Sequence, residues 1–269
     1  MTFDLEACRF HFSARDILHF PRGQAGNVLR GALGSILRKI TRAEDYSRIF
    51  EPAAPGFAAG AGPSGLADWP RPFVIRAASL DGQTLKPGDP FSFGLNLFDI
   101  RNPALEHVTR AFAQWADLIS VERSQVVIDL SPGSTPVSRI RVEFQTPTEL
   151  KAAGGVGSAE FSVLLARARD RVSTLRSLYG AGPLEIDFRE LAERARSVKT
   201  VRCELQQVAI ERRSRRTGQR HGIGGFIGIA EYEGDLAEFV PYLQAAHWTG
   251  VGRHCTWGNG QIHTENSEF

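Results

Sequence analysis

A short segment rich in proline, glycine and serine divides the chain almost at its midpoint. It runs from Ser131 to Pro136 (Ser-Pro-Gly-Ser-Thr-Pro) in a chain of 269 residues. Proline and glycine interrupt helices and strands, so such a segment is typical of a linker between domains. We therefore expect an N-terminal domain over residues 1–130 and a C-terminal domain over residues 137–269, both of ordinary domain size.

The two halves contain the same order of expected elements, strand–helix–strand followed by strand–helix–strand. Apolar residues at every third or fourth position predict helices, and alternating ones predict strands. In the N-terminal half we expect strands at 3–12, 73–78, 90–98 and 120–130 and helices at 27–40 and 103–117. In the C-terminal half we expect strands at 140–146, 201–211, 225–233 and after Gly258, and helices at 161–179, 187–197 and 235–248.

This order is that of the split βαβ motif, so we predict an α+β protein with two tandem ferredoxin-like (RRM-like) domains. Asp235 is expected to be the N-cap of the last helix, because a side-chain carboxylate can accept the first free amides of a helix. The duplication is visible only in the order of elements, since no short sequence repeat accompanies it.

The positive charge of the chain is almost entirely arginine, with lysine only at positions 39, 86, 151 and 199. The formal net charge of +2 is too small to identify a nucleic-acid partner. Guanidinium groups suit phosphate binding, but a GC-rich genome also favours arginine codons. Composition alone therefore favours the codon explanation over phosphate binding.

Cysteine and hydropathy patterns point to a cytoplasmic protein. Cys8, Cys203 and Cys255 are far apart and none has CxxC spacing, so we expect reduced thiols. No apolar run approaches the roughly 20 residues that span a bilayer, and the first residues do not resemble a secretory signal. We therefore expect no membrane association.

The segment most suggestive of function is Gly250–Gly260, with the sequence Gly-Val-Gly-Arg-His-Cys-Thr-Trp-Gly-Asn-Gly. Paired glycines allow tight turns and close approach of a ligand to the backbone. Clustered amides beside Arg253 could hold phosphate oxygens. An ordinary helix-to-strand turn is the alternative. We take Gly250, Gly252, Arg253, Gly258 and Gly260 as candidate RNA-binding residues.

A second candidate segment is strongly basic and lies between two expected strands. Five arginines occur between Arg212 and Arg220, and a further glycine-rich turn follows at Gly224–Gly228. A solvated charge run is the common explanation for such a sequence. A basic hairpin tip is also a good element for contacting RNA, so the candidates here are Arg212, Arg213, Arg215 and Arg216.

The first expected helix carries Arg30 beside two glycines, Gly31 and Gly34. A glycine inside a helix costs roughly 1 kcal/mol relative to alanine. Close packing of the helix against a sheet explains the glycines but not the arginine. Arg30 is therefore a further candidate RNA-binding residue.

Three parts of the chain together resemble the RAMP superfamily, and specifically the CRISPR repeat-RNA processing endoribonucleases. The first is the helix region from Phe20-Pro21 to Leu37, which contains Leu-Arg-Gly-Ala. The second is Tyr46–Pro52 with Arg71-Pro-Phe-Val and Pro87-Gly-Asp-Pro-Phe. The third, and most specific, is Gly224–Gly228 together with Gly250-Val-Gly-Arg and Gly258-Asn-Gly260.

The resemblance implies tandem ferredoxin-like domains that bind CRISPR precursor RNA and cleave it within repeats without a metal ion or cofactor. In that chemistry a base deprotonates a ribose 2′-hydroxyl, an acid protonates the leaving 5′-oxygen, and a cation stabilises the phosphorane. Histidine suits the acid and base roles, and arginine or lysine suits the third. Partners implied are repeat RNA, a CRISPR effector complex and a second copy of the chain.

The chain departs from the family pattern because its first helix contains no histidine, where members often carry a catalytic histidine or tyrosine. The segment Thr41–Asp45 also lacks the cysteines of related members, so no metal is expected there. His247, His254 and His19 rank highest as catalytic candidates because they flank the elements expected to contact RNA; Tyr46 is a lesser alternative. A non-catalytic RNA-binding subunit and a protein-interaction scaffold remain alternatives.

Overall fold

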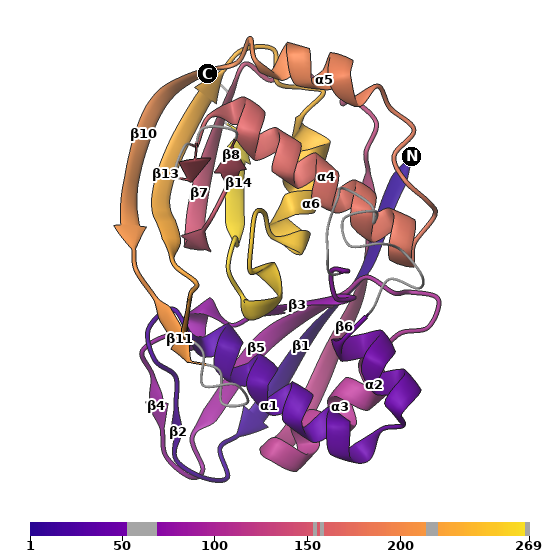
Figure 1. Cartoon of the computed structure of the whole chain (residues 1–269), viewed down its shortest axis with the longest axis vertical. Coiled ribbons are helices and arrows are strands. Elements are labelled where there is room, and N and C mark those ends of the chain that lie inside the picture. The colour runs from indigo at the N-terminus through magenta and orange to yellow at the C-terminus, as the bar shows by residue number, and fades with distance from the viewer. Residues whose placement is uncertain (53–68, 153–154, 157–158, 214–219, 267–269) are drawn as a thin grey trace.

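The computed structural model describes residues 1–52, 69–152, 155–156, 159–213 and 220–266. Each half of the chain forms one four-stranded antiparallel sheet. The two sheets lie one above the other along the long axis in Figure 1, with helices packed against each.

The N-terminal sheet contains β1 (Thr2–Ser13), β3 (Phe73–Arg76), β5 (Pro90–Leu97) and β6 (Asp117–Asp129) in the order β3-β5-β1-β6. Helix α1 (Ala25–Ile40) follows β1, and α3 (Leu105–Trp115) follows β5. A short helix, α2 (Ala43–Phe50), comes directly after α1. Smaller elements are β2 (Leu18–His19), paired with β4 (Thr84–Leu85), and the 3-10 turn η2 (Ala78–Leu80).

The C-terminal sheet contains β7 (Arg139–Thr148), β10 (Lys199–Val208), β13 (Gly225–Glu233) and β14 (Ile262–Asn266) in the order β10-β13-β7-β14. Helix α4 (Phe161–Tyr179) follows β7, and α6 (Val240–Thr249) follows β13. The remaining elements are β8 (Lys151–Ala152), β9 (Gly155–Val156), α5 (Phe188–Ala195), β11 (Glu211–Arg213), β12 (Arg220–Gly222) and the 3-10 turn η3 (Cys255–Trp257).

Both sheets have the same topology. In each, the first and third strands are central, the second lies outside the third, and the fourth lies outside the first. This is the strand order of a ferredoxin-like domain, so the predicted α+β fold with two such domains is confirmed. Strand β6 ends at Asp129 and β7 begins at Arg139, with the proline-containing segment between them.

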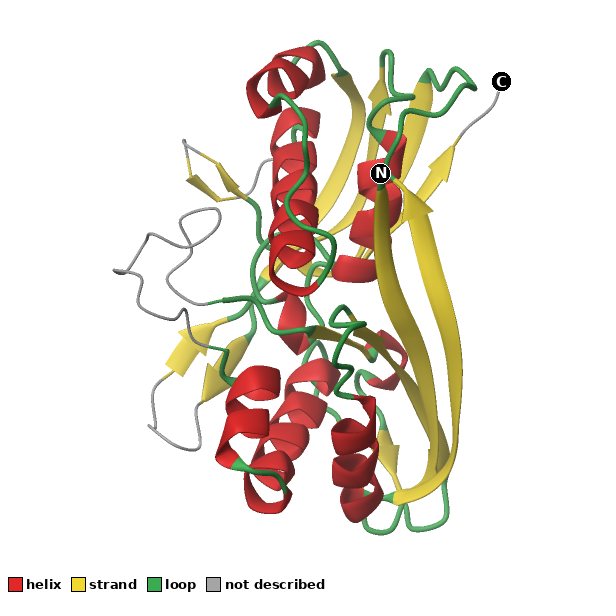
Figure 2. Ribbon diagram, turned by 90° about the vertical axis from the view of Figure 1, so that its right-hand side faces the viewer, coloured by secondary structure: helices red, strands yellow, loops and turns green. Residues whose placement is uncertain are grey.

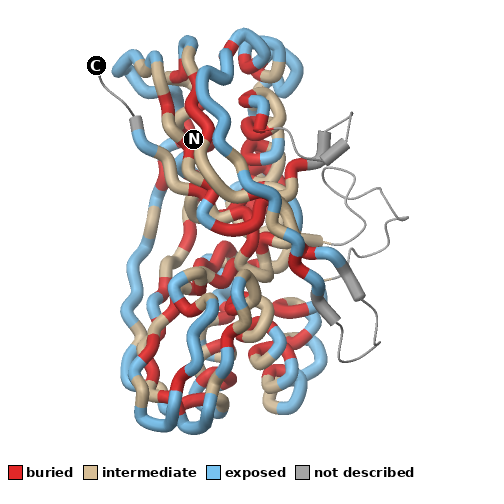
Figure 3. Tube along the Cα trace, turned by 90° about the vertical axis from the view of Figure 1, so that its left-hand side faces the viewer, coloured by how far each residue is buried: buried red, intermediate tan, exposed pale blue. Residues whose placement is uncertain are grey.

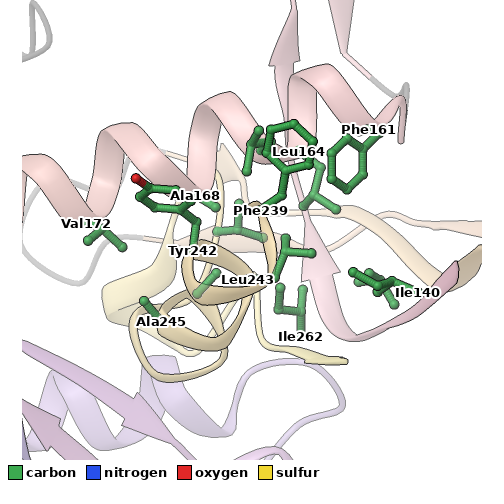
Figure 4. Packing of buried hydrophobic residues seen from close by; sticks show 14 of the residues in the cluster. Ile140, Phe161, Leu164, Ala168, Val172, Phe239, Tyr242, Leu243, Ala245 and Ile262 are labelled. Carbon is green, nitrogen blue, oxygen red and sulfur yellow. The ribbon is translucent and has the colours of Figure 1, made fainter. Parts of the chain in front are cut away.

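The apolar core is continuous between the two halves because β1 buries opposite faces at its two ends. Phe10 and Phe12 pack under α1 and α3, whereas Phe3 and Leu5 point to the other face and join the core of the C-terminal half. Figure 4 shows part of that core, where Phe161 and Leu164 of α4 face Phe239 and Leu243 near α6. Figure 3 accordingly shows buried segments where the two halves of the chain meet.

One expectation about the helices was wrong, and one helix was not expected. The last helix begins at Val240 with Phe239 as its N-cap, and Asp235 does not cap it. Pro241 explains the later start, because proline lacks an amide hydrogen and fits only the first turn of a helix. Helix α2 was not expected from the sequence, because it is only eight residues long and leaves little length over which an apolar period could be recognised.

In the described part of the chain, no helix combines the length and apolar character that crossing a membrane requires.

Candidate RNA interface and active site

The glycine-rich loop, residues Gly250–Gly260, connects α6 to β14 and contains η3. Gly250, Gly252, Gly258 and Gly260 all have positive φ angles, between 70° and 87°. At Gly252 (φ 81°) a side chain would in addition meet the carbonyl oxygen of Glu149. The loop therefore needs glycine both for its conformation and for its close packing on the end of β7.

Most amides of this loop already donate hydrogen bonds to main-chain carbonyls. Gly250 donates to the carbonyl of Ala246, Gly258 to that of Cys255 and Gly260 to that of Pro147, at 2.9–3.0 Å. The amide of Arg253 donates to the Glu149 carbonyl at 3.1 Å. An RNA contact by these glycines would thus use close approach to the backbone rather than amide donation.

The loop also packs on the first turn of α1. A side chain at Gly26 would meet the carbonyl group of Trp257, so the helix and the loop touch through their backbones. The Arg30 guanidinium lies 4.7 Å from the ring centre of Phe50 and 5.5 Å from that of Trp257. Arg30 is nearly buried and joins α1, α2 and the loop through cation–π contacts.

The basic hairpin, formed by β11 and β12, is anchored beside the same loop. Its base is held by a backbone bond from Ile223 to Ile210 at 2.9 Å, and Ile210 in turn approaches Gly23 just before α1. The buried side chain of Asn259 donates to the Ile223 carbonyl at 2.6 Å. The two glycine-rich segments singled out from the sequence therefore meet at one place.

The hairpin arginines themselves are only partly described. The backbone of Arg212 pairs with His221 and that of Arg213 with Arg220. Arg215 and Arg216 lie outside the described residues.

Glu149 holds the two polar side chains at the centre of the loop. Arg253 Nη1 donates to Glu149 Oε1 at 2.7 Å, and His254 Nε2 lies 3.5 Å from Glu149 Oε2. The His254 ring stacks on Trp257 with centroids 4.6 Å apart and planes 7° from parallel. The backbone of His254 has a φ of 63°, which is uncommon for a residue with a side chain. Such unusual backbone conformations cluster at functional sites.

His247 lies in the last turn of α6, half-buried. Its Nδ1 is 3.0 Å from the carbonyl oxygen of Ile262. Since a carbonyl only accepts, Nδ1 carries the hydrogen and Nε2 is left as an acceptor. Burial lowers the pKa of His247, and the charges of Arg76 and His263 lower it further, while the bond to Ile262 opposes the shift. His247 is thus neutral at pH 7.

His19 and Tyr46 occupy other surroundings. His19 lies on the β2–β4 ribbon, exposed, with Nδ1 2.8 Å from Thr84 Oγ1. Tyr46 on α2 stacks on Phe50 and its hydroxyl donates to Glu51 at 3.2 Å. Burial raises the pKa of Tyr46, and Glu51 adds to the shift. Of the catalytic candidates, only His254 lies within the loop that meets α1 and the hairpin.

Sequence reasoning missed the residues that attach the end of α6 to its neighbours. The carbonyls of His247, Trp248 and Thr249 accept hydrogen bonds from Arg76 Nη1 (2.6 Å), Asn96 Nδ2 (2.7 Å) and Arg171 Nε (2.8 Å), respectively. Arg76 and Asn96 interrupt apolar runs in β3 and β5. A polar residue within such a run was the signal available in the sequence.

Over the described ranges, no group of three or more His, Cys, Asp or Glu side chains is placed to hold a metal ion.

The fold and this junction define a class: RAMP-fold proteins built from tandem ferredoxin-like domains with a glycine-rich loop. Residues 142–262 match the family model of the CRISPR-associated endoribonuclease Cas6, and residues 3–129 match a model described as an N-terminal domain. Residues 142–262 therefore match the endoribonuclease family that the sequence resembles, and the resemblance is supported over the C-terminal half of the chain. No curated protein matches the chain.

Solved Cas6 structures share the fold over almost the whole chain. A Cas6 product complex matches 97% of this chain and 100% of its own, with 15% identity and a TM-score of 0.59. The Cas6 of Thermus thermophilus matches 97% of this chain and 98% of its own, with 13% identity and a TM-score of 0.58. A partial Cas6-RT-Cas1–Cas2 complex matches 98% of this chain and 46% of its own, with 13% identity and a TM-score of 0.64.

Proposed function

We propose that this protein binds CRISPR precursor RNA and cleaves it within the repeats, without a metal ion, through attack of a ribose 2′-hydroxyl on the adjacent phosphate. The observation that carries this proposal is the junction where the loop bearing His254 meets both the first turn of α1 and the base of the basic hairpin. A potential acid–base group therefore lies among the elements best suited to hold an RNA backbone.

The reaction needs two proton transfers and one stabilised charge. A base removes the 2′-hydroxyl proton as the 2′-oxygen bonds to phosphorus. The bond from phosphorus to the 5′-oxygen then breaks, an acid gives that oxygen a proton, and a 2′,3′-cyclic phosphate remains. A nearby guanidinium stabilises the extra negative charge of the phosphorane.

We assign the acid role to His254 first. It lies within the glycine-rich loop, and Glu149 Oε2, 3.5 Å from His254 Nε2, can hold the imidazole in place. His247 is the second candidate and suits the base role, since its Nε2 is an unprotonated acceptor. His19 is third because it lies on the separate β2–β4 ribbon.

RNA binding is assigned to the residues around the same junction. Arg30, Arg253 and the hairpin residues Arg212, Arg213, Arg215 and Arg216 supply positive charge, and Gly250, Gly252, Gly258 and Gly260 allow close approach. Further proposed partners are a CRISPR effector complex and a second copy of this chain.

Incubating the purified protein with repeat RNA in EDTA tests the activity. We expect a product ending in a 2′,3′-cyclic phosphate, and no cleavage when the nucleotide at the cut site is 2′-deoxy. Cleavage of the deoxy substrate would rule out the mechanism. Binding without cleavage would instead support the second candidate function, a non-catalytic RNA-binding subunit, which the lack of a histidine in α1 favours. Negligible RNA affinity would support a protein-interaction scaffold.

A further inference from the structure

Two arginines on the N-terminal sheet are not paired with acids. Among the described residues, no carboxylate lies within salt-bridge distance of Arg9 on β1 or Arg76 on β3. The described contacts of these side chains are with Ser92 Oγ, 3.0 Å from Arg9 Nη2, and with the His247 carbonyl, 2.6 Å from Arg76 Nη1. Both contacts leave the positive charges uncompensated.

The equivalent face of the C-terminal sheet is different. There Arg139 is paired with Glu231 and Glu233, Arg202 with Glu204 and Glu231, and Arg141 with Glu265, at 2.6–3.1 Å. These three arginines of the C-terminal sheet are therefore paired with acids, whereas Arg9 and Arg76 of the N-terminal sheet are not.

The strand register places the two unpaired arginines on the same face, on either side of a glycine. Gly94 on β5 is directly opposite Arg76 on one side and Arg9 on the other. Paired residues of antiparallel strands project to the same face. A Cβ built at Gly94 would lie 3.1 Å from Arg76 Cβ, which confirms that face. We call Arg76, Gly94 and Arg9 the arginine row.

The arginine row lies at the limit of the sheet face that the C-terminal half covers. Asn96, two residues along β5 from Gly94, donates to the Trp248 carbonyl at the end of α6. Helices α1 and α3 pack on the opposite face of this sheet, as Figure 2 shows from the side. Arg9 is exposed and Ser92 and Gly94 are partly exposed, whereas the Arg76 guanidinium is largely covered where it bonds to the end of α6.

One carboxylate lies beside the arginine row. Glu122 on β6 is opposite Arg9, and its Oε1 is 3.1 Å from His11 Nε2. The arginine row therefore carries two guanidinium groups beside one carboxylate, which lies nearer to His11 than to Arg9.

We propose that the arginine row binds backbone phosphates of the repeat RNA at a second site, on the face of the N-terminal sheet, where β3 packs on η3 of the glycine-rich loop. This rests on the proposed function. Without a side chain at Gly94, a phosphate can approach the sheet between two guanidinium groups that lie two strands apart, about 10 Å between their strands. Arginine is suited to bidentate phosphate binding.

Three variants of the full chain test the site: Arg9→Ala, Gly94→Asp and Glu122→Gln. The probes are the repeat RNA of the CRISPR array nearest the gene and poly(U) RNA of equal length, with dissociation constants measured over a salt series. Arg196→Ala is the matched control, since Arg196 is an exposed arginine at the C-terminal end of α5 that pairs with Glu193.

We expect Arg9→Ala and Gly94→Asp to weaken binding of both RNAs about 3- to 10-fold, and Arg9→Ala to reduce the slope of log K against log salt by roughly 0.7 for a single strand. Glu122→Gln should tighten binding, and Arg196→Ala should change nothing. Unchanged affinity and slope in both Arg9→Ala and Gly94→Asp would overturn the proposal. So would a loss confined to repeat RNA, because phosphate contacts do not read sequence.

The outcome is independent of cleavage. If the protein binds RNA through the arginine row but never cuts it, the proposed endoribonuclease activity fails and the second site stands. If it cuts normally while Arg9→Ala and Gly94→Asp bind RNA like the unmodified protein, the second site alone fails.

Discussion

Asn259 and Ile223 connect the two glycine-rich segments of the chain: the buried side-chain amide of Asn259 donates to the main-chain carbonyl of Ile223 at 2.6 Å. This bond fixes the glycine-rich loop against the base of the basic hairpin. The orientation of the hairpin relative to His254 therefore depends on a side chain that need not touch RNA.

Replacing Asn259 by leucine should lower the free energy of unfolding by about 1–3 kcal/mol, because a buried carbonyl loses its donor. We also expect weaker RNA binding, since the hairpin base is no longer held. Urea unfolding and an RNA titration measure the two effects. Gln244→Ala, at an exposed position of α6, is the control. An Asn259→Leu variant with the unfolding curve of the unmodified protein would contradict the role given to this bond.

Replacing His254 by asparagine tests the proposed acid. Asparagine tolerates the left-handed backbone that His254 adopts at φ 63°, so the loop should keep its shape. We expect the single-turnover cleavage rate to fall about 10²- to 10⁴-fold, the usual contribution of general acid–base catalysis, with RNA affinity nearly unchanged. His107→Asn on α3 serves as control. A cleavage rate within a few-fold of that of the unmodified protein would show that His254 is not the acid, and His247 and His19 would then be the remaining candidates.

The lowered pKa of His247 predicts a loss of stability in acid. Its ordinary pKa is 6.5, and burial depresses it in the folded protein. Between the two values the unfolded chain binds the proton and the folded chain does not, so stability is complete above about pH 6.5 and declines as pH falls through the folded pKa. Urea unfolding at pH 7.5 and 5.5 should show a smaller decline for His247→Gln than for the unmodified protein. Equal declines would show that His247 does not carry this dependence.

The order of elements was predictable because each sheet strand has clear alternation or an apolar run, and each main helix has a periodic apolar face. The start of α6 was not predictable, because Asp235 is a good N-cap residue. The local sequence does not show that the helix instead begins at Val240, with Pro241 in its first turn. The loop glycines were visible as a motif. The hydrogen bond of the Gly260 amide was not, because its acceptor, the Pro147 carbonyl, lies in β7, more than a hundred residues earlier.

The shared core also escaped sequence reasoning. Phe3 and Leu5 alternate with their neighbours like any strand, and only the tertiary packing shows that they join the core of the other half. The segment Ser131–Pro136 lies between the last strand of one sheet and the first strand of the other, but it does not tell whether each half could fold alone.

Dividing the chain at this linker should therefore destabilise both parts. A fragment of residues 1–130 would expose Phe3, Leu5, Phe98 and Ile128, which are buried against the C-terminal half. We expect the two fragments to aggregate or remain unfolded when produced separately, and the full chain to unfold in one cooperative transition. Circular dichroism during heating checks both. A separately folded fragment 1–130 with a sharp transition would contradict the shared core.

Gly252 and Gly88 form a matched pair for testing the glycine-rich loop. Both have positive φ, 81° and 91°, so alanine strains the backbone at either position. At Gly88 nothing lies within 4 Å of the added methyl group, whereas at Gly252 it would meet the carbonyl oxygen of Glu149. We expect Gly88→Ala to cost about 1 kcal/mol from conformation alone. Gly252→Ala should cost clearly more and should also slow cleavage, because the Glu149 backbone that it displaces carries the carboxylate beside His254 and Arg253. Equal losses of stability in the two variants, with cleavage unaffected, would show that the loop needs glycine at 252 only for its φ angle and not for its contact with β7.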